Sequence, residues 1–144
     1  MTATYLDSSA MVKLYADEDH HDAVRSLSGG LITSSLARVE VVAAFYGKAR
    51  SGEVPIEVAQ VLATVFLTDW NEGRFLPVSS DTPIELEAAR LVARYPLRGF
   101  DAVHLATANA ARRALPECST FACFDKKLNA AAAGELFTLL TTEA

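Results

Sequence analysis

The stretch Thr4-Tyr5-Leu6-Asp7-Ser8-Ser9-Ala10-Met11-Val12 decides the fold that we expect for this chain. Residues 4–6 form a short β-prone run, and the sequence from Ser8 onward is typical of a helix start. Asp7 is therefore expected where a strand gives way to a helix. In an open α/β sheet this junction lies at the carboxyl edge, where such sheets bind their ligands.

Four further β-prone runs follow, at residues 31–33, 75–78, 120–124 and 137–140, and longer helical patterns separate them. This alternation predicts an α/β fold, a parallel sheet of about five strands flanked by helices, in one domain over residues 1–144. Ser34 or Ser35 is expected to cap a helix that continues to about Lys48. Thr82-Pro83-Ile84-Glu85 has the form of a capping box with proline at the first helical position.

The composition indicates a globular protein. Of 144 residues, 51% are hydrophobic and 22% are charged, and we find neither an apolar run of membrane-spanning length nor a secretory signal, so we expect a cytoplasmic location. The net charge of −5 argues against broad adhesion to phosphate backbones, so contact with nucleic acid must be local or carried by metal. Cys118 and Cys123 are expected to be reduced core or loop residues.

Three more acids occupy positions comparable to that of Asp7. Asp125 directly follows the fourth β-prone run, and Glu40 lies in the first or second turn of the helix after the second run. Asp101 opens the apolar helix Ala102-Val103-His104-Leu105-Ala106. All four acids therefore fall near helix starts that follow strands or turns, and we expect them to face one crevice.

Each acid also has an ordinary explanation. An Asp at a strand-to-helix junction is a favoured N-cap, and the neighbouring Arg38 and Arg98 could form salt bridges with Glu40 and Asp101. In one pocket, however, four carboxylates would repel one another and would have to take up protons or a cation. Oxygen ligands of this kind suit Mg²⁺ or Mn²⁺ and do not suit zinc.

Around these acids the sequence resembles a known family. The opening block is similar to that of PIN-domain proteins, in particular the VapC-type toxins of bacterial toxin–antitoxin pairs. The blocks are Tyr5-Leu6-Asp7-Ser8-Ser9-Ala10-Met11-Val12-Lys13-Leu14-Tyr15, Ser34-Ser35-Leu36-Ala37-Arg38-Val39-Glu40, Leu97-Arg98-Gly99-Phe100-Asp101-Ala102-Val103-His104-Leu105-Ala106-Thr107-Ala108 and Phe121-Ala122-Cys123-Phe124-Asp125-Lys126-Lys127-Leu128. No single block is specific, but four in order, running through essentially the whole chain, are.

The resemblance implies a magnesium-dependent endoribonuclease whose parallel sheet has the strand order 3-2-1-4-5. It makes Asp7, Glu40, Asp101 and Asp125 the catalytic and metal-binding set, with Ser9 as a polar helper beside Asp7. It also implies homodimerisation and inhibition by a small antitoxin whose tail enters the pocket. Asp125 is the least secure of the four acids, because the family includes members whose fourth acid contributes little.

One position departs from the family pattern. Cys123 stands two residues before the last acid, where many relatives carry Thr or Ser. A thiol is a weak hydrogen-bonding group, so we expect little support of the site from this position.

The predicted reaction is hydrolysis of an RNA phosphodiester, in which Mg²⁺ activates water and neutralises charge on the phosphate oxygens. His104, three residues after Asp101, fits a packed histidine with a hydrogen-bonded ring better than a general base. Basic residues could steer RNA inward as a margin of the pocket, namely Lys13, Arg38, Arg98, Lys126 and Lys127. A wide apolar helix face is expected to pack in the core or to form a dimer surface, and it comprises Ile56, Val58, Val61, Leu62, Val65 and Phe66.

Other classes of protein fit the acids less well. A phosphoacceptor receiver domain needs adjacent acids after the first strand and an Asp after the third, but this chain offers only Asp7 and then Pro77-Val78-Ser79-Ser80. A haloacid-dehalogenase-type phosphatase needs a second Asp where Ser9 stands. A non-catalytic PIN-like interaction module would be marked by the loss of one or more acids, and all four are present.

Overall fold

Five parallel strands form the centre of the structure, a computed structural model that describes residues 2–140. The strands are β1 (Ala3–Leu6), β2 (Gly30–Ser34), β3 (Leu76–Val78), β4 (Cys118–Ala122) and β5 (Thr138–Leu139). Their order across the sheet is β3-β2-β1-β4-β5, and each neighbouring pair is parallel. The predicted fold class and strand order are therefore confirmed. Since β1 is central, its carboxyl end lies between those of β2 and β4.

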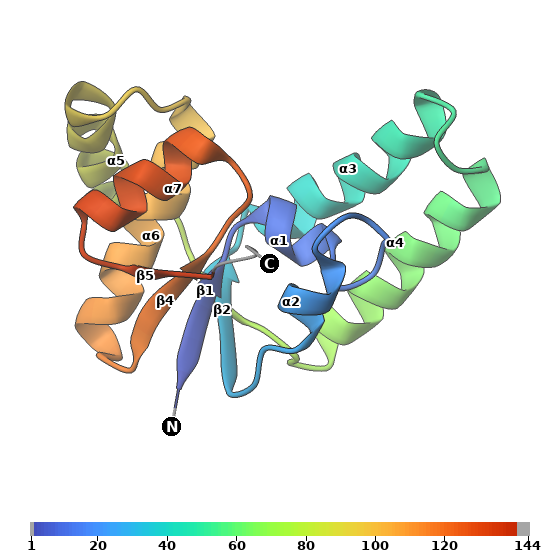
Figure 1. Cartoon of the computed structure of the whole chain (residues 1–144), viewed down its shortest axis with the longest axis horizontal. Helices are drawn as coiled ribbons and strands as arrows, with labels where there is room; N and C mark the ends of the chain where they lie inside the picture. The colour runs from blue at the N-terminus through green and yellow to red at the C-terminus, as the bar shows by residue number, and fades with distance from the viewer. Residues whose placement is uncertain (1, 141–144) are drawn as a thin grey trace.

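Helices cover both faces of the sheet (Figure 1). On one face lie α1 (Ser8–Val12), α2 (His21–Arg25), α3 (Ala37–Arg50) and α4 (Ile56–Asn71), and on the other lie α5 (Thr82–Arg94), α6 (Gly99–Ala114) and α7 (Lys126–Gly134). Each face has its own cluster of buried apolar side chains, as expected for a sheet covered on both sides.

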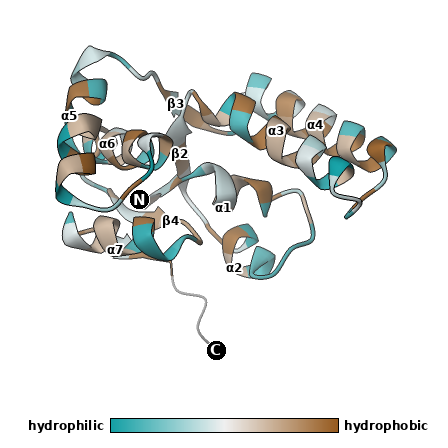
Figure 2. Ribbon diagram, turned by 90° about the horizontal axis from the view of Figure 1, so that it is seen from above, coloured by the Kyte–Doolittle hydropathy of each residue, from teal (hydrophilic) through white to brown (hydrophobic). Residues whose placement is uncertain are grey.

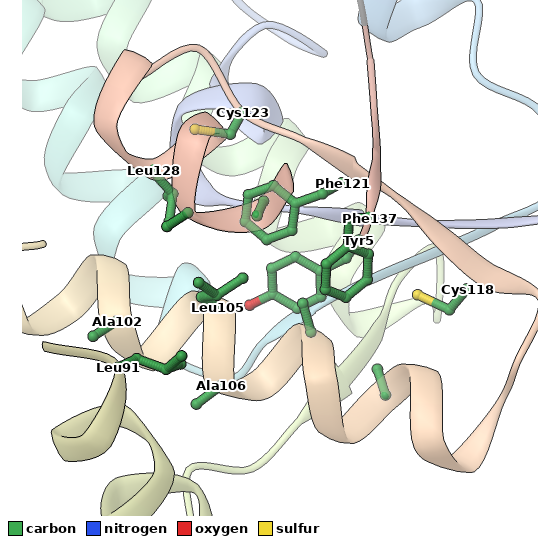
Figure 3. Packing of buried hydrophobic residues seen from close by; sticks show 14 of the residues in the cluster. Tyr5, Leu91, Ala102, Leu105, Ala106, Cys118, Phe121, Cys123, Leu128 and Phe137 are labelled. Atoms are coloured by element: carbon green, nitrogen blue, oxygen red, sulfur yellow. The ribbon is translucent and has the colours of Figure 1, made fainter. Parts of the chain in front are cut away.

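Neighbouring residues of β1 belong to different clusters. Tyr5 and Leu6 are both fully buried, but Tyr5 packs with side chains of α6 and α7, and Leu6 packs with side chains of α1 and α3. Figure 3 shows the Tyr5 ring beside Phe121, whose centroid lies 5.4 Å away, with the phenol oxygen directed toward the helix that carries Leu105. A hydroxyl is thus brought into an apolar core, where it needs a hydrogen-bond partner.

The predicted N-cap of α3 is wrong. Ser34 does not cap α3: its hydroxyl accepts a hydrogen bond from the Leu36 N–H at 3.1 Å, and α3 begins at Ala37 without a side-chain cap. The reason is that the Ser35 N–H bonds to the Val78 carbonyl at 2.9 Å and prolongs the pairing with β3.

The start of α5 differs from its prediction for another reason. Asp81, and not Thr82, is the N-cap, since its carboxylate accepts a hydrogen bond from the Ile84 N–H at 3.1 Å. Both residue types can cap a helix, and Asp ranks above Thr in this position.

The apolar face predicted on α4 is only partly used as core. Phe66 is fully buried, whereas Ile56, Val58, Val61 and Val65 are between 40% and 61% exposed. Figure 2 shows α3 and α4 running side by side as a pair that projects away from α5, α6 and α7. The core interpretation is wrong for these four side chains, and the dimer surface stays a prediction. Across residues 2–140, no helix has both the length and the apolar character needed to cross a membrane.

Candidate active site

The four predicted acids line one pocket at the carboxyl edge of the sheet. Asp7 follows β1, Glu40 and Asp101 lie in the first turns of α3 and α6, and Asp125 is the N-cap of α7. The pocket has a volume of about 250 Å³, and its remaining lining residues are Ser8, Ser9, Arg98, His104 and Phe124. Strand ends and helix starts thus bring together carboxylates that lie far apart in the sequence.

Asp7 is the most deeply buried of the four acids, with 5% of its surface exposed. Its Oδ1 accepts hydrogen bonds from the Ser9 hydroxyl at 2.7 Å and from the Ala10 N–H at 2.9 Å. Burial raises the pKa of Asp7, although the neighbouring His104 and the bonds from Ser9 and Ala10 act in the opposite direction. Asp7 is therefore an N-cap and a member of the pocket at once.

Glu40 is held by two donors. Its Oε1 accepts a hydrogen bond from the Ser8 hydroxyl at 2.7 Å and lies 2.8 Å from Nε2 of His104. Burial acts to raise the pKa of Glu40, but the bonds from His104 and Ser8 outweigh it and hold the pKa below its ordinary value. His104 is 2% exposed, and its Nδ1 lies 2.8 Å from the Tyr5 hydroxyl. The interpretation of His104 as a packed histidine with a hydrogen-bonded ring is confirmed.

Asp101 has the opposite surroundings. Within residues 2–140 its carboxylate forms no salt bridge and no hydrogen bond. Burial raises the pKa of Asp101, and the charges of Asp125 and Asp7 raise it further, against weaker effects of His104 and Arg98. This is the pattern expected of carboxylates gathered without enough positive charge.

The salt-bridge explanation of the acids is wrong for the part of the chain that the structure describes. Arg98 lines the same pocket as Asp101 but does not reach ion-pair distance, and Arg38 is exposed and does not pair with Glu40. The close partner of Glu40 is His104, which lies 64 positions away in the sequence.

Asp125 is reached by a short turn. β4 ends at Ala122, two residues earlier than predicted, and Cys123 and Phe124 connect it to Asp125. Oδ2 of Asp125 accepts a hydrogen bond from the Leu128 N–H at 2.9 Å, and the Asp125 N–H donates to the Cys123 sulfur at 3.2 Å. Cys123 therefore does support the site, as an acceptor within this turn. Both cysteines are free and buried, as predicted.

The donors of this pocket fit a hard cation in their chemistry. Carboxylate and hydroxyl oxygens predominate, and a bound cation would relieve the repulsion at Asp101. In residues 2–140, no three His, Cys, Asp or Glu side chains are close enough together to hold a metal ion, so the carboxylates would have to approach one another on binding. That these acids bind metal and act in catalysis stays a prediction.

A larger cavity of about 560 Å³ adjoins the acid pocket and shares Asp101, Asp125 and Arg98 with it. Lys126 and Lys127 line this cavity, so three of the five predicted basic residues do border the acids. The prediction is wrong for Lys13. It is only 9% exposed, and its ammonium group bonds to Glu18 at 3.0 Å.

Sequence reasoning missed three residues of the site. Ser8 binds Glu40, Tyr5 binds His104, and Phe124 lines the pocket. The available signals were weak: Ser8 is a hydroxyl in the first turn after Asp7, and Tyr5 is a polar group on the core side of a buried strand. Phe124 had only its position before Asp125.

Known proteins resemble this chain in sequence. The family model described as PIN domain matches residues 4–134. Two curated relatives from two strains of Mycobacterium tuberculosis, named Ribonuclease VapC45 and Ribonuclease VapC49, are each 34% identical to this chain over 114 residues, which covers 75% of this chain and 76% of the relative.

Solved structures resemble the fold at lower identity. VapC20 of Mycobacterium tuberculosis, described as a sarcin-ricin loop cleaving toxin, has a TM-score of 0.62 at 17% identity, covering 89% of this chain and 94% of that one. A toxin–antitoxin complex from Klebsiella pneumoniae has a TM-score of 0.56 at 17% identity, covering 86% and 88%. These structural likenesses concern the fold alone, whereas the family model extends over nearly the whole sequence. The chain belongs to the PIN-domain family.

Proposed function

We propose that the protein is a Mg²⁺-dependent endoribonuclease and the toxin of a toxin–antitoxin pair, with Asp7, Glu40, Asp101 and Asp125 as its metal-binding and catalytic residues. The observation that carries the proposal is the state of Asp101, a half-buried carboxylate next to Asp125 and Asp7 and without a cationic partner among residues 2–140. Like-charged groups kept in one pocket favour a cation, and oxygen ligands favour Mg²⁺ or Mn²⁺. The 34% identity to two proteins named ribonucleases supports the same reaction.

Some residues of the chain would bind the cation, and others hold those ligands in position. When bound, Mg²⁺ would supply activation of water and neutralisation of charge on the phosphate. Ser9 and the start of α1 hold one oxygen of Asp7, Ser8 and His104 hold one oxygen of Glu40, and the start of α7 holds one oxygen of Asp125. These bonds leave the second oxygen of each carboxylate for a cation.

Basic residues beside the pocket are proposed to receive the RNA backbone. Arg98, Lys126 and Lys127 line the adjoining cavity, directly next to Asp101 and Asp125. Because the net charge of the chain is −5, a local cluster of positive charge is what a phosphate needs here, and these three residues supply one. Attraction would therefore be confined to the mouth of the pocket.

A cleavage assay tests the reaction. Purified protein is incubated with total bacterial RNA in Mg²⁺, in Mn²⁺ and in chelator, and the new RNA ends are mapped by sequencing. We expect cleavage with either metal, none in chelator, and none for Asp7→Asn. Asp81→Asn is a matched control, since it makes the same change at a helix N-cap outside the pocket.

Two results would overturn the proposal. Full cleavage in chelator would exclude the metal mechanism. Cleavage by folded Asp7→Asn at the rate of the control variant would show that the site lies elsewhere. RNA binding without any cleavage would instead favour a non-catalytic interaction module.

The proposed partners are a small antitoxin and a second copy of this chain. The likeness in fold to a solved toxin–antitoxin complex supports the antitoxin, and the exposed side chains Val58, Val61 and Val65 on α4 suit a dimer surface. Expression of the chain alone should arrest growth of a bacterial host, while the Asp7→Asn chain at equal level should not. Co-expression of an adjacent small gene should restore growth. Sedimentation at high concentration should give the mass of a dimer, and a strictly monomeric mass would contradict that part.

A further inference from the structure

A chain of hydrogen bonds leads from the core to the acid pocket. The Tyr5 hydroxyl lies 2.8 Å from Nδ1 of His104, and Nε2 of His104 lies 2.8 Å from Oε1 of Glu40. Tyr5 and His104 are 0% and 2% exposed. The three side chains come from β1, α6 and α3, so the chain connects three elements that surround the pocket.

The chemistry of the two ends fixes the direction of these hydrogen bonds. Oε1 of Glu40 accepts a hydrogen bond from the Ser8 hydroxyl at 2.7 Å, and a carboxylate oxygen of this kind is also an acceptor toward Nε2 of His104. Nε2 of His104 must then carry a hydrogen. At the other end, the Tyr5 phenol carries one hydrogen, and Nδ1 of His104 lies 2.8 Å away as an acceptor for it.

One tautomer of His104 satisfies both ends. A phenol that donates to Nδ1 leaves the ring neutral, with its hydrogen on Nε2, and this hydrogen points to Glu40. Ser8 reinforces the arrangement, because its hydroxyl donates to the same carboxylate oxygen at 2.7 Å and lies 3.3 Å from Nε2. With Oε1 bonded twice, only the other oxygen of Glu40 is left for a ligand in the pocket.

We propose that Tyr5 and His104 are positioning residues for Glu40: Tyr5 selects the Nε2–H tautomer of His104, and that tautomer holds Glu40 in the orientation in which it meets a cation. The part concerning the cation rests on the proposed function. An apolar pair would fill the same core volume, but it would have no directed bond ending at the pocket. Residues that hydrogen-bond to a metal ligand and orient it contribute about 10–100-fold to metal affinity or activity.

Nitrogen NMR of the metal-free protein tests the tautomer directly. Long-range proton–nitrogen spectra distinguish the two ring nitrogens, and His104→Gln assigns the signals. We expect an unprotonated Nδ1 and a protonated Nε2 in the wild type, and a marked change of the Nδ1 signal in Tyr5→Phe. Tyr95→Phe is the matched control, because it removes another phenol oxygen that bonds to a carboxylate, Glu135, at 2.6 Å. A hydrogen on Nδ1 in the wild type, alone or together with one on Nε2, would overturn the proposal.

Calorimetric titration with Mn²⁺ tests the effect on Glu40. We expect Tyr5→Phe and His104→Leu to weaken Mn²⁺ affinity by about tenfold, and His104→Gln, which keeps a donor toward Glu40, to stay close to the wild type. Equal affinity of wild type and folded Tyr5→Phe, or equal losses for the Leu and Gln variants, would contradict a positioning role. If wild-type protein binds no Mn²⁺, the proposed function fails, and the tautomer is still decided by the spectra.

Discussion

Glu18 and Asp101 are two partly buried acids in neighbouring regions, and they differ in the charge of their neighbours. Glu18 lies between Lys13, at 3.0 Å, and Lys48, which is in still closer contact. Burial acts to raise the pKa of Glu18, but the two lysines outweigh it and lower the pKa. Around Asp101 the neighbours are Asp125 and Asp7, and they add to the effect of burial.

This difference separates an acid that stabilises the fold from acids that cost the fold stability. Both regions contain polar side chains of the α1 segment, since Ser9 lines the cavity that holds Glu18 as well as the acid pocket. Position alone therefore does not decide the role of an acid. A carboxylate between lysines has its charge neutralised within the folded protein. Carboxylates that repel one another need a positively charged ligand to neutralise them.

The largest expected effect is on RNA cleavage. Asp101→Asn should lower the cleavage rate on the order of a hundredfold or more, because it removes a carboxylate from the proposed metal site. Glu18→Gln should cleave at nearly the wild-type rate, when assayed well below its melting temperature. Rates measured with one RNA and one Mg²⁺ concentration make the comparison, and equal losses in the two variants would mean that the regions do not differ in function.

The next largest effect is the response of stability to metal. Mg²⁺ at a hundred times its dissociation constant should stabilise the wild type by about 2.7 kcal/mol, through mass action on the folded state. Glu18→Gln should gain the same amount and Asp101→Asn far less. Melting curves with chelator and with Mg²⁺ measure these gains. Equal gains in all three proteins would exclude Asp101 from the metal site.

The sequence predicted the framework of both the fold and the site, for a physical reason. β-prone runs and helical patterns are local, and a carboxyl-edge position follows from them once the sheet is parallel, as for Asp7 and Asp125. The strand order came from the family resemblance and not from the pattern. Helix starts were less predictable, because Asp81 and Thr82 are both able to cap and only the backbone geometry selects one of them.

Pairings across the fold could not be predicted. Whether Glu40 meets Arg38 or His104, and whether Lys13 faces RNA or Glu18, depends on the rotation of each helix about its axis when it packs. A shift of one residue in the helix turns a side chain by about 100°. Such pairings decide which acids are neutralised, so they also decide the difference between the two regions.

In metal-free protein the two variants should change stability in opposite directions. Glu18→Gln should lose about 1–2 kcal/mol, since it leaves Lys13 and Lys48 without their shared partner in a partly buried site. Asp101→Asn should be as stable as the wild type or more stable, by about 1 kcal/mol at most, because it removes a repelled charge. Urea unfolding in chelator measures both, and a destabilised Asp101→Asn would argue that Asp101 has a structural role.

The smallest effect concerns how these differences depend on pH. Because the pKa of Glu18 in the folded state lies below its ordinary value of 4.5, its contribution to stability is complete above that value and is lost as the pH falls through the folded pKa. The pKa of Asp101 lies above its ordinary value of 3.8, so the folded protein takes up the proton first. The cost of this carboxylate to stability therefore disappears as the pH falls through the folded pKa toward 3.8.

In metal-free buffer near neutral pH, therefore, Glu18→Gln should be less stable than the wild type and Asp101→Asn more stable. Both differences in unfolding free energy should shrink toward zero in acid. Urea unfolding at a series of pH values between neutral and acid measures the two differences. If Asp101→Asn were still more stable than the wild type below pH 3.8, charge repulsion would not be what separates the acid pocket from the lysine-paired site.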